Sequence, residues 1–177
     1  EYTEADLSST FPANGNTNPS TASYQRLAQN NFADWTLEVD GLVQAPGTFS
    51  LAALRAMPSR TQITRHDCVE GWSAIGTWSG ASFRGVADLV APLPRARYVM
   101  FRSFDSGYSN GWDLASAMHP QTILAYAYND RRLMPDHGAP LRLYSPTKLG
   151  YTNTKYLFSL EFTATLTPPF APQPCVC

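Results

Sequence analysis

From Trp35 onward the sequence is divided into short apolar segments, and this limits the folds that are open to it. Residues 35–43 alternate apolar and polar side chains, which is typical of a half-buried strand. Turn residues occur at Asp40-Gly41 and again at Ala45-Pro46-Gly47. The later apolar segments are equally short, and helical and extended ones follow each other without a regular order. This pattern predicts an α+β fold with mixed β-sheets and short helices, not a regular βαβ alternation.

The expected elements follow from periodicity and from capping residues. Ser50 is a good N-cap for a helix over 51–57, and Pro58 ends that helix. Further helical segments are expected at 24–29, 82–90 and 114–118. Strands are expected at 35–43, 61–65, 97–101, 122–128, 141–144 and 155–166, of which the last is the longest.

Changes in composition along the chain predict three regions. Residues 1–34 are polar and rich in turn residues, and they predict an extended arm, with a disordered leader as the alternative. Residues 35–166 are expected to form the folded domain, because a chain of 177 residues with 44% apolar content can bury one sizeable core. Residues 167–177 form a Pro-rich tail that contains Cys175 and Cys177.

Composition also argues against several classes of protein. The net charge of -1 makes sequence-independent binding to nucleic acid improbable. No run of 18 apolar residues predicts a membrane-spanning helix. Three cysteines without a paired C-x-x-C pattern are too few for a disulfide scaffold or a structural zinc site. Fingerprints of dinucleotide enzymes, P-loop NTPases and α/β-hydrolases are missing. Because the chain begins at Glu1, we expect a mature or trimmed form whose targeting segment is not included.

Cys68 lies in the segment with the most chemical content. It follows an expected strand and enters a loop rich in glycine and tryptophan. One interpretation is a buried cysteine that acts as a small apolar side chain. The others are a nucleophile or a soft thiolate ligand, and the neighbouring Arg65 and His66 would favour the thiolate. A thiol hydrolase would need a base as well, for which the chain offers only His66, His119 and His137.

A second group of functional residues begins at His137. The run His137-Gly138-Ala139-Pro140-Leu141-Arg142 is a Gly/Pro turn that leads into a strand, and Lys155 follows a later turn that begins near Gly150. Arginine, lysine and the N–H groups of turns are the groups that bind phosphate or pyrophosphate. Ordinary surface charge beside a hairpin is the alternative for this segment.

Taken together, these segments resemble the sulfite-oxidase family of molybdenum enzymes, specifically its molybdopterin-binding domain. The resemblance runs from about Phe11 to Phe162, and it depends on the order and spacing of motifs that are weak individually. These motifs are Phe11–Gly15, W-x-L-x-V-x-G-x-V at 35–43, Cys68–Ser73, Trp78-x-Gly80, Tyr98-Val99-x-Phe101, Ala117–Pro120, Leu124–Tyr126, H-G-x-P-x-R at 137–142, and Gly150-Tyr151 leading to Lys155.

The resemblance implies a molybdenum–molybdopterin cofactor and a role for each matching residue. Cys68 matches the cysteine that ligates molybdenum through its thiolate, and soft sulfur from Cys68 and from the pterin dithiolene suits this metal. Oxygens fill the two remaining positions, and the metal cycles between Mo(VI) and Mo(IV) as an oxygen atom moves. The residues that match cofactor-binding positions are Asn14 in the arm, Ser103, His137 and Arg142 in the turn, and Asn153, Thr154 and Lys155 in the loop that closes over the phosphate.

Five more residues and the arm acquire expectations from the same resemblance. An arm that holds Asn14 against a cofactor is ordered in the loaded protein. Trp72 and Trp78 are expected to pack around the cofactor. His66 either orients the metal site or is a hydrogen-bonded loop histidine. The remaining two, Asp105 and Tyr108, lie in the Gly/Ser-rich segment 104–112 and by position could line a substrate funnel.

Departures from sulfite oxidases favour the bacterial reductase branch of the family. Sulfite oxidases carry C-x-G-N-R-R after the ligating cysteine, whereas this chain has Cys68-Val69-Glu70-Gly71-Trp72-Ser73. Sulfite would thus lose a charge-assisted contact of about 1.5–3 kcal/mol. The chain also has only about fifteen residues after Phe162 in place of an immunoglobulin-like dimerisation domain. In the reductase branch C-V-E-A-W-S is typical, the substrates are sulfoxides including protein methionine sulfoxide, and electrons come from a membrane haem-b subunit.

Three functions remain open at this stage. The first is a periplasmic or exported molybdenum reductase, exported folded by the twin-arginine route, that moves oxygen from an S-oxide or N-oxide, small or protein-bound. The second is a small sulfite dehydrogenase or oxidase that passes electrons to a cytochrome. The third is a metal-free binding or structural module that kept the fold. A redox partner is expected for the first two, because the chain has no haem or flavin fingerprint, and a monomer is expected throughout.

Overall fold

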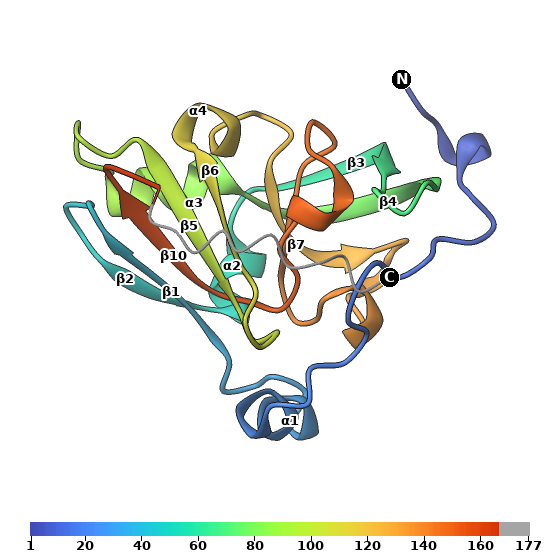
Figure 1. Cartoon of the computed structure of the whole chain (residues 1–177), viewed down its shortest axis with the longest axis horizontal. Coiled ribbons are helices and arrows are strands. Elements are labelled where there is room, and N and C mark those ends of the chain that lie inside the picture. Colours follow the sequence, from blue (N-terminus) through green and yellow to red (C-terminus); the bar gives the residue numbers. More distant parts are fainter. Residues whose placement is uncertain (167–177) are drawn as a thin grey trace.

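The computed structural model describes residues 1–166, and the tail with Cys175 and Cys177 lies outside the described residues. Its strands form two five-stranded sheets (Figure 1). The first sheet has the order β2 (Gly47–Ser50), β1 (Thr36–Gly41), β10 (Leu157–Thr163), β5 (Tyr98–Ser103) and β6 (Ser109–Asp113). The second has the order β3 (Ser59–Asp67), β4 (Ser73–Ser82), β7 (Ile123–Tyr128) and β8 (Arg131–Arg132), and β9 (Arg142–Tyr144) also pairs with β7.

Short helices connect these strands, as the sequence predicts. They are α1 (Ala22–Gln29), α2 (Leu51–Ala56), α3 (Phe83–Val90) and α4 (Leu114–Ala117), with 3₁₀ turns η1 (Glu4–Asp6), η2 (Pro135–His137) and η3 (Gly150–Thr152). The predicted cap of α2 is confirmed, because Ser50 Oγ accepts a hydrogen bond from the Ala53 N–H at 3.1 Å. The α+β class is confirmed as well. In residues 1–166 every helix is too short or too polar to cross a membrane.

The first sheet places side by side the two of its strands that come first and last along the chain, β1 and β10. β10 pairs in parallel with β1 and antiparallel with β5, so it occupies the centre of the sheet. Helix α3 presents Phe83, Val86 and Val90 to the main core, which also contains Trp35, Phe101 and Phe162. A second, smaller apolar cluster lies beside β7 and contains Trp78, Ile123, Ala125, Leu133, Ala139 and Tyr144.

Several strands differ from the sequence prediction for identifiable reasons. β10 begins at Leu157 rather than at Lys155, because Tyr156 has φ = 54°, in the left-handed region. β4 was not predicted, because its sequence is rich in small residues. A methyl group at Gly80 would overlap the backbone of Leu124, so β4 and β7 can approach only because this residue is glycine. β6 was predicted as part of a loop, and β2 and β8 were not predicted.

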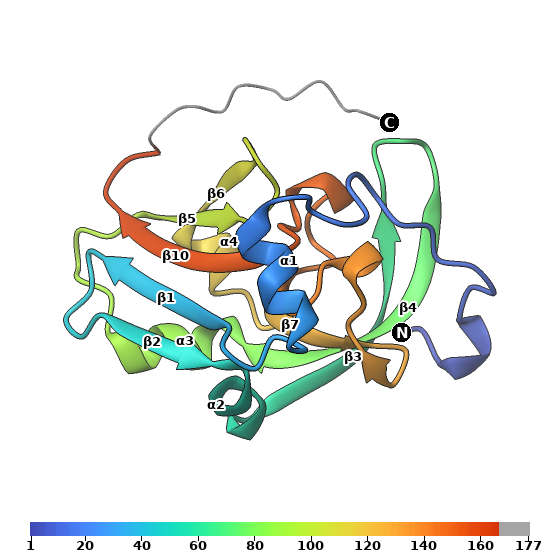
Figure 2. The ribbon, with the colours of Figure 1, turned by 90° about the horizontal axis from the view of Figure 1, so that it is seen from below.

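The arm crosses the domain before it reaches α1. Figure 2 shows it running from the β3–β4 side of the molecule toward α1, which lies across the front in this view. Near its start, the Ser8 N–H donates to Ile75 O at 3.0 Å. At its end, the buried Tyr24 on α1 donates its hydroxyl to Ala139 O at 2.9 Å. The arm is therefore held against the domain at both ends.

Candidate functional site

Cys68 lies at the start of the turn that joins β3 to β4. Its N–H donates to Trp72 O at 2.9 Å, and its carbonyl accepts from the Gly71 N–H at 3.1 Å. Gly71 has φ = 89°, which glycine adopts readily. The cysteine is a buried thiol with 8% of its surface exposed. The closed turn therefore fixes the backbone of Cys68 directly at the end of a strand.

Charged side chains around this turn are engaged by their neighbours. Glu70 Oε2 accepts from the Trp72 indole N–H at 2.8 Å, which orients the ring. Asp67 Oδ1 accepts from Arg65 Nε at 2.7 Å and from Ser73 Oγ at 2.5 Å. The guanidinium nearest to the cysteine along the chain is thus already paired with a carboxylate.

His66 is buried between two aromatic rings. It stacks on Trp72 and on Tyr144, with centroids 5.7 and 5.9 Å away. Burial, and then the positive charge of Arg142, lower the pKa of His66 to about 3, so the imidazole is neutral at physiological pH. Its Nε2 makes no hydrogen bond within residues 1–166, and a methyl group at Gly150 would overlap it. The expectation of a hydrogen-bonded loop histidine is wrong, since His66 belongs to β3 and stacks in a cluster.

Phe11 from the arm joins the cysteine turn to the turn at His137. Its ring lies 5.9 Å from the Trp72 ring and 5.7 Å from the His137 ring. It also contacts His66 and Trp78. The arm thereby brings two segments together that are 69 positions apart in the chain.

The turn at His137 fixes the orientation of the histidine. Its Nδ1 lies 2.9 Å from Asp136 Oδ1, and its ring stacks on Tyr128 with centroids 4.9 Å apart. The Asp136 carboxylate holds a proton on Nδ1, which leaves Nε2 as the other polar atom. That Nε2 is buried and makes no hydrogen bond in the described part of the chain.

Arg142 at the start of β9 is completely buried. Its terminal nitrogens donate to His137 O at 3.0 Å and to Asn153 O at 3.3 Å, so it ties together two segments that the resemblance assigns to the cofactor. Nε has no partner in residues 1–166, and no carboxylate there forms an ion pair with the guanidinium. Burial lowers the pKa of Arg142 to about 10. A cation in this position is stabilised by a nearby anion.

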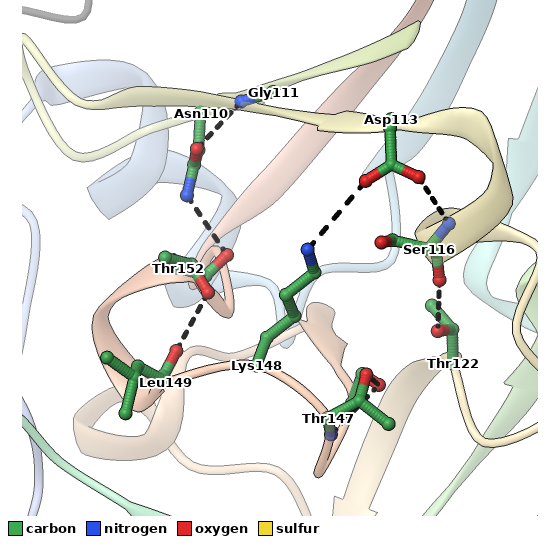
Figure 3. Close-up of polar contacts among 10 residues, drawn as sticks. Asn110, Gly111, Asp113, Ser116, Thr122, Thr147, Lys148, Leu149 and Thr152 are labelled. Atoms are coloured by element: carbon green, nitrogen blue, oxygen red, sulfur yellow. Dashed lines mark hydrogen bonds and ion pairs between the residues drawn. The ribbon is translucent and has the colours of Figure 1, made fainter. Parts of the chain in front are cut away.

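The loop that contains Asn153 and Thr154 is fixed from two sides. Asn153 Oδ1 accepts from the Ser145 N–H at 2.7 Å, so the amide holds its own loop. From β6, Asn110 donates to Thr152 O at 3.2 Å, and the Thr152 hydroxyl donates to Leu149 O (Figure 3). The figure also shows Lys148 pointing toward Asp113. Thr154, the residue after Asn153, is fully buried and lies beside Tyr108.

Lys155 lies where the arm meets the His137 turn. Its ammonium donates to Asn14 O at 2.8 Å, to Asn16 O at 2.5 Å and to Asp136 O at 2.7 Å. These three bonds use all its N–H groups, so it can offer an anion its charge more readily than a further donor. Burial, and then the charge of Arg142, lower the pKa of Lys155 to about 7. Ser103 Oγ donates to the Lys155 carbonyl at 2.7 Å.

The two expected substrate residues contact the arm and the η3 turn. Asp105 Oδ1 accepts from Asn16 Nδ2 at 3.0 Å. The Tyr108 hydroxyl donates to Tyr151 O at 2.5 Å, and burial raises the pKa of Tyr108. A substrate contact of Asp105 and Tyr108 stays a prediction.

A bound pterin phosphate fits the residues present. Two buried cations, Arg142 and Lys155, lie in segments that hydrogen bonds join to the His137 turn. Neither cation forms an ion pair with a carboxylate of residues 1–166. Two buried polar atoms of this region, Arg142 Nε and His137 Nε2, make no hydrogen bond within residues 1–166. Buried polar atoms of this kind normally have partners, and an anionic pterin would supply them. In the described residues no cluster of three or more His, Cys, Asp and Glu side chains could hold a metal ion.

The comparison with known families decides the class of protein. Residues 24–170 match the family model described as "Oxidoreductase molybdopterin binding domain". The chain belongs to this family. It is thus an oxidoreductase domain of the sulfite-oxidase type, as the sequence motifs predict.

The curated relatives of this chain carry names from the reductase branch of the family. A putative protein-methionine-sulfoxide reductase subunit, YedZ1 of Azospira oryzae, is 41% identical over 164 residues, which cover 92% of this chain and 60% of the relative. The protein-methionine-sulfoxide reductase catalytic subunit MsrP of Campylobacter jejuni is 32% identical over 77% of this chain and 52% of its own length. The chain thus spans about half the length of the curated relatives it matches.

A solved structure supports the fold. The sulfane dehydrogenase SoxCD of Paracoccus pantotrophus superimposes with a TM-score of 0.71 at 19% identity, over 75% of this chain and 39% of that chain. At this identity the likeness concerns the fold alone.

Sequence reasoning missed four residues of the site. Phe11 was noted only as part of a motif, and Asn16, Asp136 and Tyr156 were given no role. Two of these could have been found from their places beside Lys155 and His137, since neighbours in a turn often orient a functional side chain. The contact of Asn16 with Lys155 joins distant segments through a backbone carbonyl, so no side-chain pattern reveals it.

Proposed function

We propose that this molybdopterin-binding domain reduces an S-oxide, with electrons from a redox partner. The observation that carries the proposal is Arg142, a completely buried cation that joins the His137 turn to the Asn153 loop without a carboxylate ion pair in residues 1–166. An anion bound between these segments would compensate the charge. A molybdopterin phosphate is such an anion, and the family match supports this choice.

The residues would divide the binding of the cofactor between them. Arg142 and Lys155 supply positive charge for the phosphate, and His137 offers Nε2 to the pterin. Cys68 would be the protein's ligand to molybdenum, because a thiolate is a soft donor that suits this metal. When bound, the group supplies two-electron oxygen-atom transfer. Asn14, Ser103, Asn153 and Thr154 would shape the walls around it.

The turn at Cys68 supports a neutral substrate rather than sulfite. The Arg65 side chain is engaged by Asp67 and Ser73, and Glu70 lies two residues beyond the cysteine. A dianion such as sulfite would meet the Glu70 carboxylate at this turn, and the Arg65 guanidinium beside the turn is already engaged. A sulfoxide group carries no net charge, and its reduction consumes two electrons and two protons to give the sulfide and one water.

Partners and location follow as parts of the same proposal. The names of the relatives support methionine sulfoxide, small or protein-bound, as the substrate. A cytochrome or a membrane haem-b subunit would deliver the electrons. After export, the protein would work in the bacterial periplasm, and it would do so as a monomer. An N-oxide substrate belongs to the same reaction class.

The proposal is tested by metal content and by the direction of turnover. The purified chain should contain close to one molybdenum per chain and should reduce methionine sulfoxide with a reduced dye as donor. Sulfite with an artificial acceptor should react more slowly. A chain that binds no molybdenum when it is produced with an intact cofactor pathway would instead be a metal-free module, and faster sulfite turnover would favour the dehydrogenase.

A further inference from the structure

Lys155 and Tyr156 are consecutive in the chain, yet both side chains reach one carbonyl oxygen of the arm. The Tyr156 hydroxyl donates to Asn16 O at 2.7 Å, and Lys155 Nζ donates to the same oxygen at 2.5 Å. In a regular strand, consecutive side chains point to opposite faces. The φ of 54° at Tyr156 breaks the strand and lets the two groups converge. This conformation is unfavourable for a residue with a side chain, so surrounding contacts must maintain it.

The remaining bonds of Lys155 join the arm to the His137 turn. Its ammonium donates to Asn14 O and to Asp136 O, which lies directly before His137. Gly138 makes this approach possible, because a methyl group there would lie 2.9 Å from Lys155 Cβ. One ammonium thus bonds to segments that are 120 positions or more apart.

A third segment completes the junction. The Asn16 amide donates to Asp105 Oδ1 at 3.0 Å, and the Ser103 hydroxyl donates to the Lys155 carbonyl at 2.7 Å. Both partners come from the end of β5 and the loop after it. The arm between 14 and 16 is therefore fastened to the domain from two directions.

We infer that Lys155 and Tyr156 form a latch that fastens residues 14–16 of the arm over the His137 turn. Lys155 is then a positioning residue, which assembles one wall of the site through backbone carbonyls. The inference rests on the proposed function only in that this wall borders the cofactor. The latch determines how often the arm opens, and hence how readily a cofactor enters or leaves beneath it.

Limited proteolysis of the chain tests the latch directly. Proteinase K cleavage between residues 8 and 20, followed by mass spectrometry, reports how often the arm opens. In Lys155→Met, cleavage should be faster by about tenfold or more, because the hydrogen bonds of Lys155 to three carbonyls are lost. In Tyr156→Phe, which keeps the ring and removes one bond, it should be faster by about threefold.

Two controls separate the latch from general loss of structure. Lys155→Arg should restore slow cleavage in large part, since its guanidinium can also donate to several carbonyls. Lys148→Met removes the only other lysine of the chain, which faces Asp113, and should cleave like the unaltered chain. Cleavage within β7 should stay slow in every variant. If the Lys155→Met variant does not accumulate as folded protein, the cleavage rate of the arm in Tyr156→Phe decides whether the latch exists.

Unaltered cleavage of the arm in both Lys155→Met and Tyr156→Phe would overturn the inference. So would an arm in the unaltered chain that is cut as fast as a free peptide of residues 8–20. The measurement uses chain produced without molybdopterin, and the same variants produced with it are analysed for molybdenum. A closed arm in a chain that never binds molybdenum would leave the latch standing and refute the proposed function.

Discussion

The guanidinium of Arg142 lies over the indole ring of Trp78, 4.9 Å from its centroid. Because both side chains are completely buried, the ring and two backbone carbonyls fix the cation where water does not reach it. Arg142→Ala should therefore lower molybdenum occupancy by about tenfold or more, while the cofactor-free chain still folds. Metal analysis of protein purified from cofactor-producing cells measures the occupancy.

The matched control for this variant is Arg102→Ala. Arg102 forms an exposed ion pair with Glu161 at 2.5 Å, between the neighbouring strands β5 and β10. Its removal should change the free energy of unfolding by less than about 1 kcal/mol and leave the metal content unaltered. Equal molybdenum in the Arg142 and Arg102 variants would show that the phosphate is held elsewhere.

Cys68→Ser should abolish turnover and retain the fold. The exchange of sulfur for oxygen at a buried position with 8% exposure changes little volume, so unfolding should shift by about 1–2 kcal/mol at most. A serine hydroxyl is a poor, hard ligand, and the rate should fall by at least about a hundredfold. Turnover and the metal absorption spectrum are the measurements, with Cys175→Ser as the control. Normal turnover in Cys68→Ser would exclude the assignment of this thiolate.

The stability of the cofactor-free chain should increase between pH 7 and pH 9. The folded pKa of Lys155 is lowered to about 7 by burial and by Arg142, whereas the unfolded chain has the ordinary value near 10.4. Between these values the unfolded state binds more protons, so a higher pH favours the folded state. The gain from this residue is about 2 kcal/mol over this interval.

Urea unfolding at pH 7 and pH 9 measures this effect. Lys155→Met should lack most of the gain, and the difference between the two chains isolates Lys155 from other groups that titrate. A bound phosphate raises the pKa of a neighbouring ammonium, so the loaded protein should show a smaller gain. The idea fails if Lys155→Met and the unaltered chain have the same pH dependence.

Gly150→Ala should destabilise the site through His66. The added methyl group would overlap His66 Nε2, and the imidazole cannot move aside because Trp72 and Tyr144 stack on it. We expect a loss of about 1–3 kcal/mol in unfolding free energy, together with reduced turnover.

Gly47→Ala is the control for crowding at a glycine. Its methyl group would lie 3.5 Å from the Phe49 ring, an ordinary contact, and the loss should stay within about 0.5 kcal/mol. Thermal or urea unfolding of both variants is sufficient. A tolerated alanine at position 150 would mean that His66 has room to rotate.

The sequence predicted those elements whose local pattern agrees with their environment. β1 was visible because Leu37 and Val39 are buried and alternate with exposed positions, and α2 because Ser50 caps it. β4 has no such signal, since its small residues are selected by the close approach of β7 and not by β propensity. That selection is a tertiary effect, so a reading of local sequence misses it.

The site was predictable where a motif carries the chemistry. Cys68 and the turn at His137 could be singled out from residue type and spacing, and their roles stay predictions that the variants above test. The junction at Lys155 could not, because its three acceptors are backbone carbonyls, which every residue possesses. The left-handed backbone at Tyr156 was equally hidden, since tyrosine gives no sign of it in the sequence.

The central place of β10 between β1 and β5 determines when the domain can form during synthesis. Until Thr163 has left the ribosome, β1 and β5 have no strand between them, and the first sheet cannot close. Contacts between such distant parts of the chain form slowly. Because Lys155 and Tyr156 directly precede β10, the proposed cofactor site would take shape in the same late step.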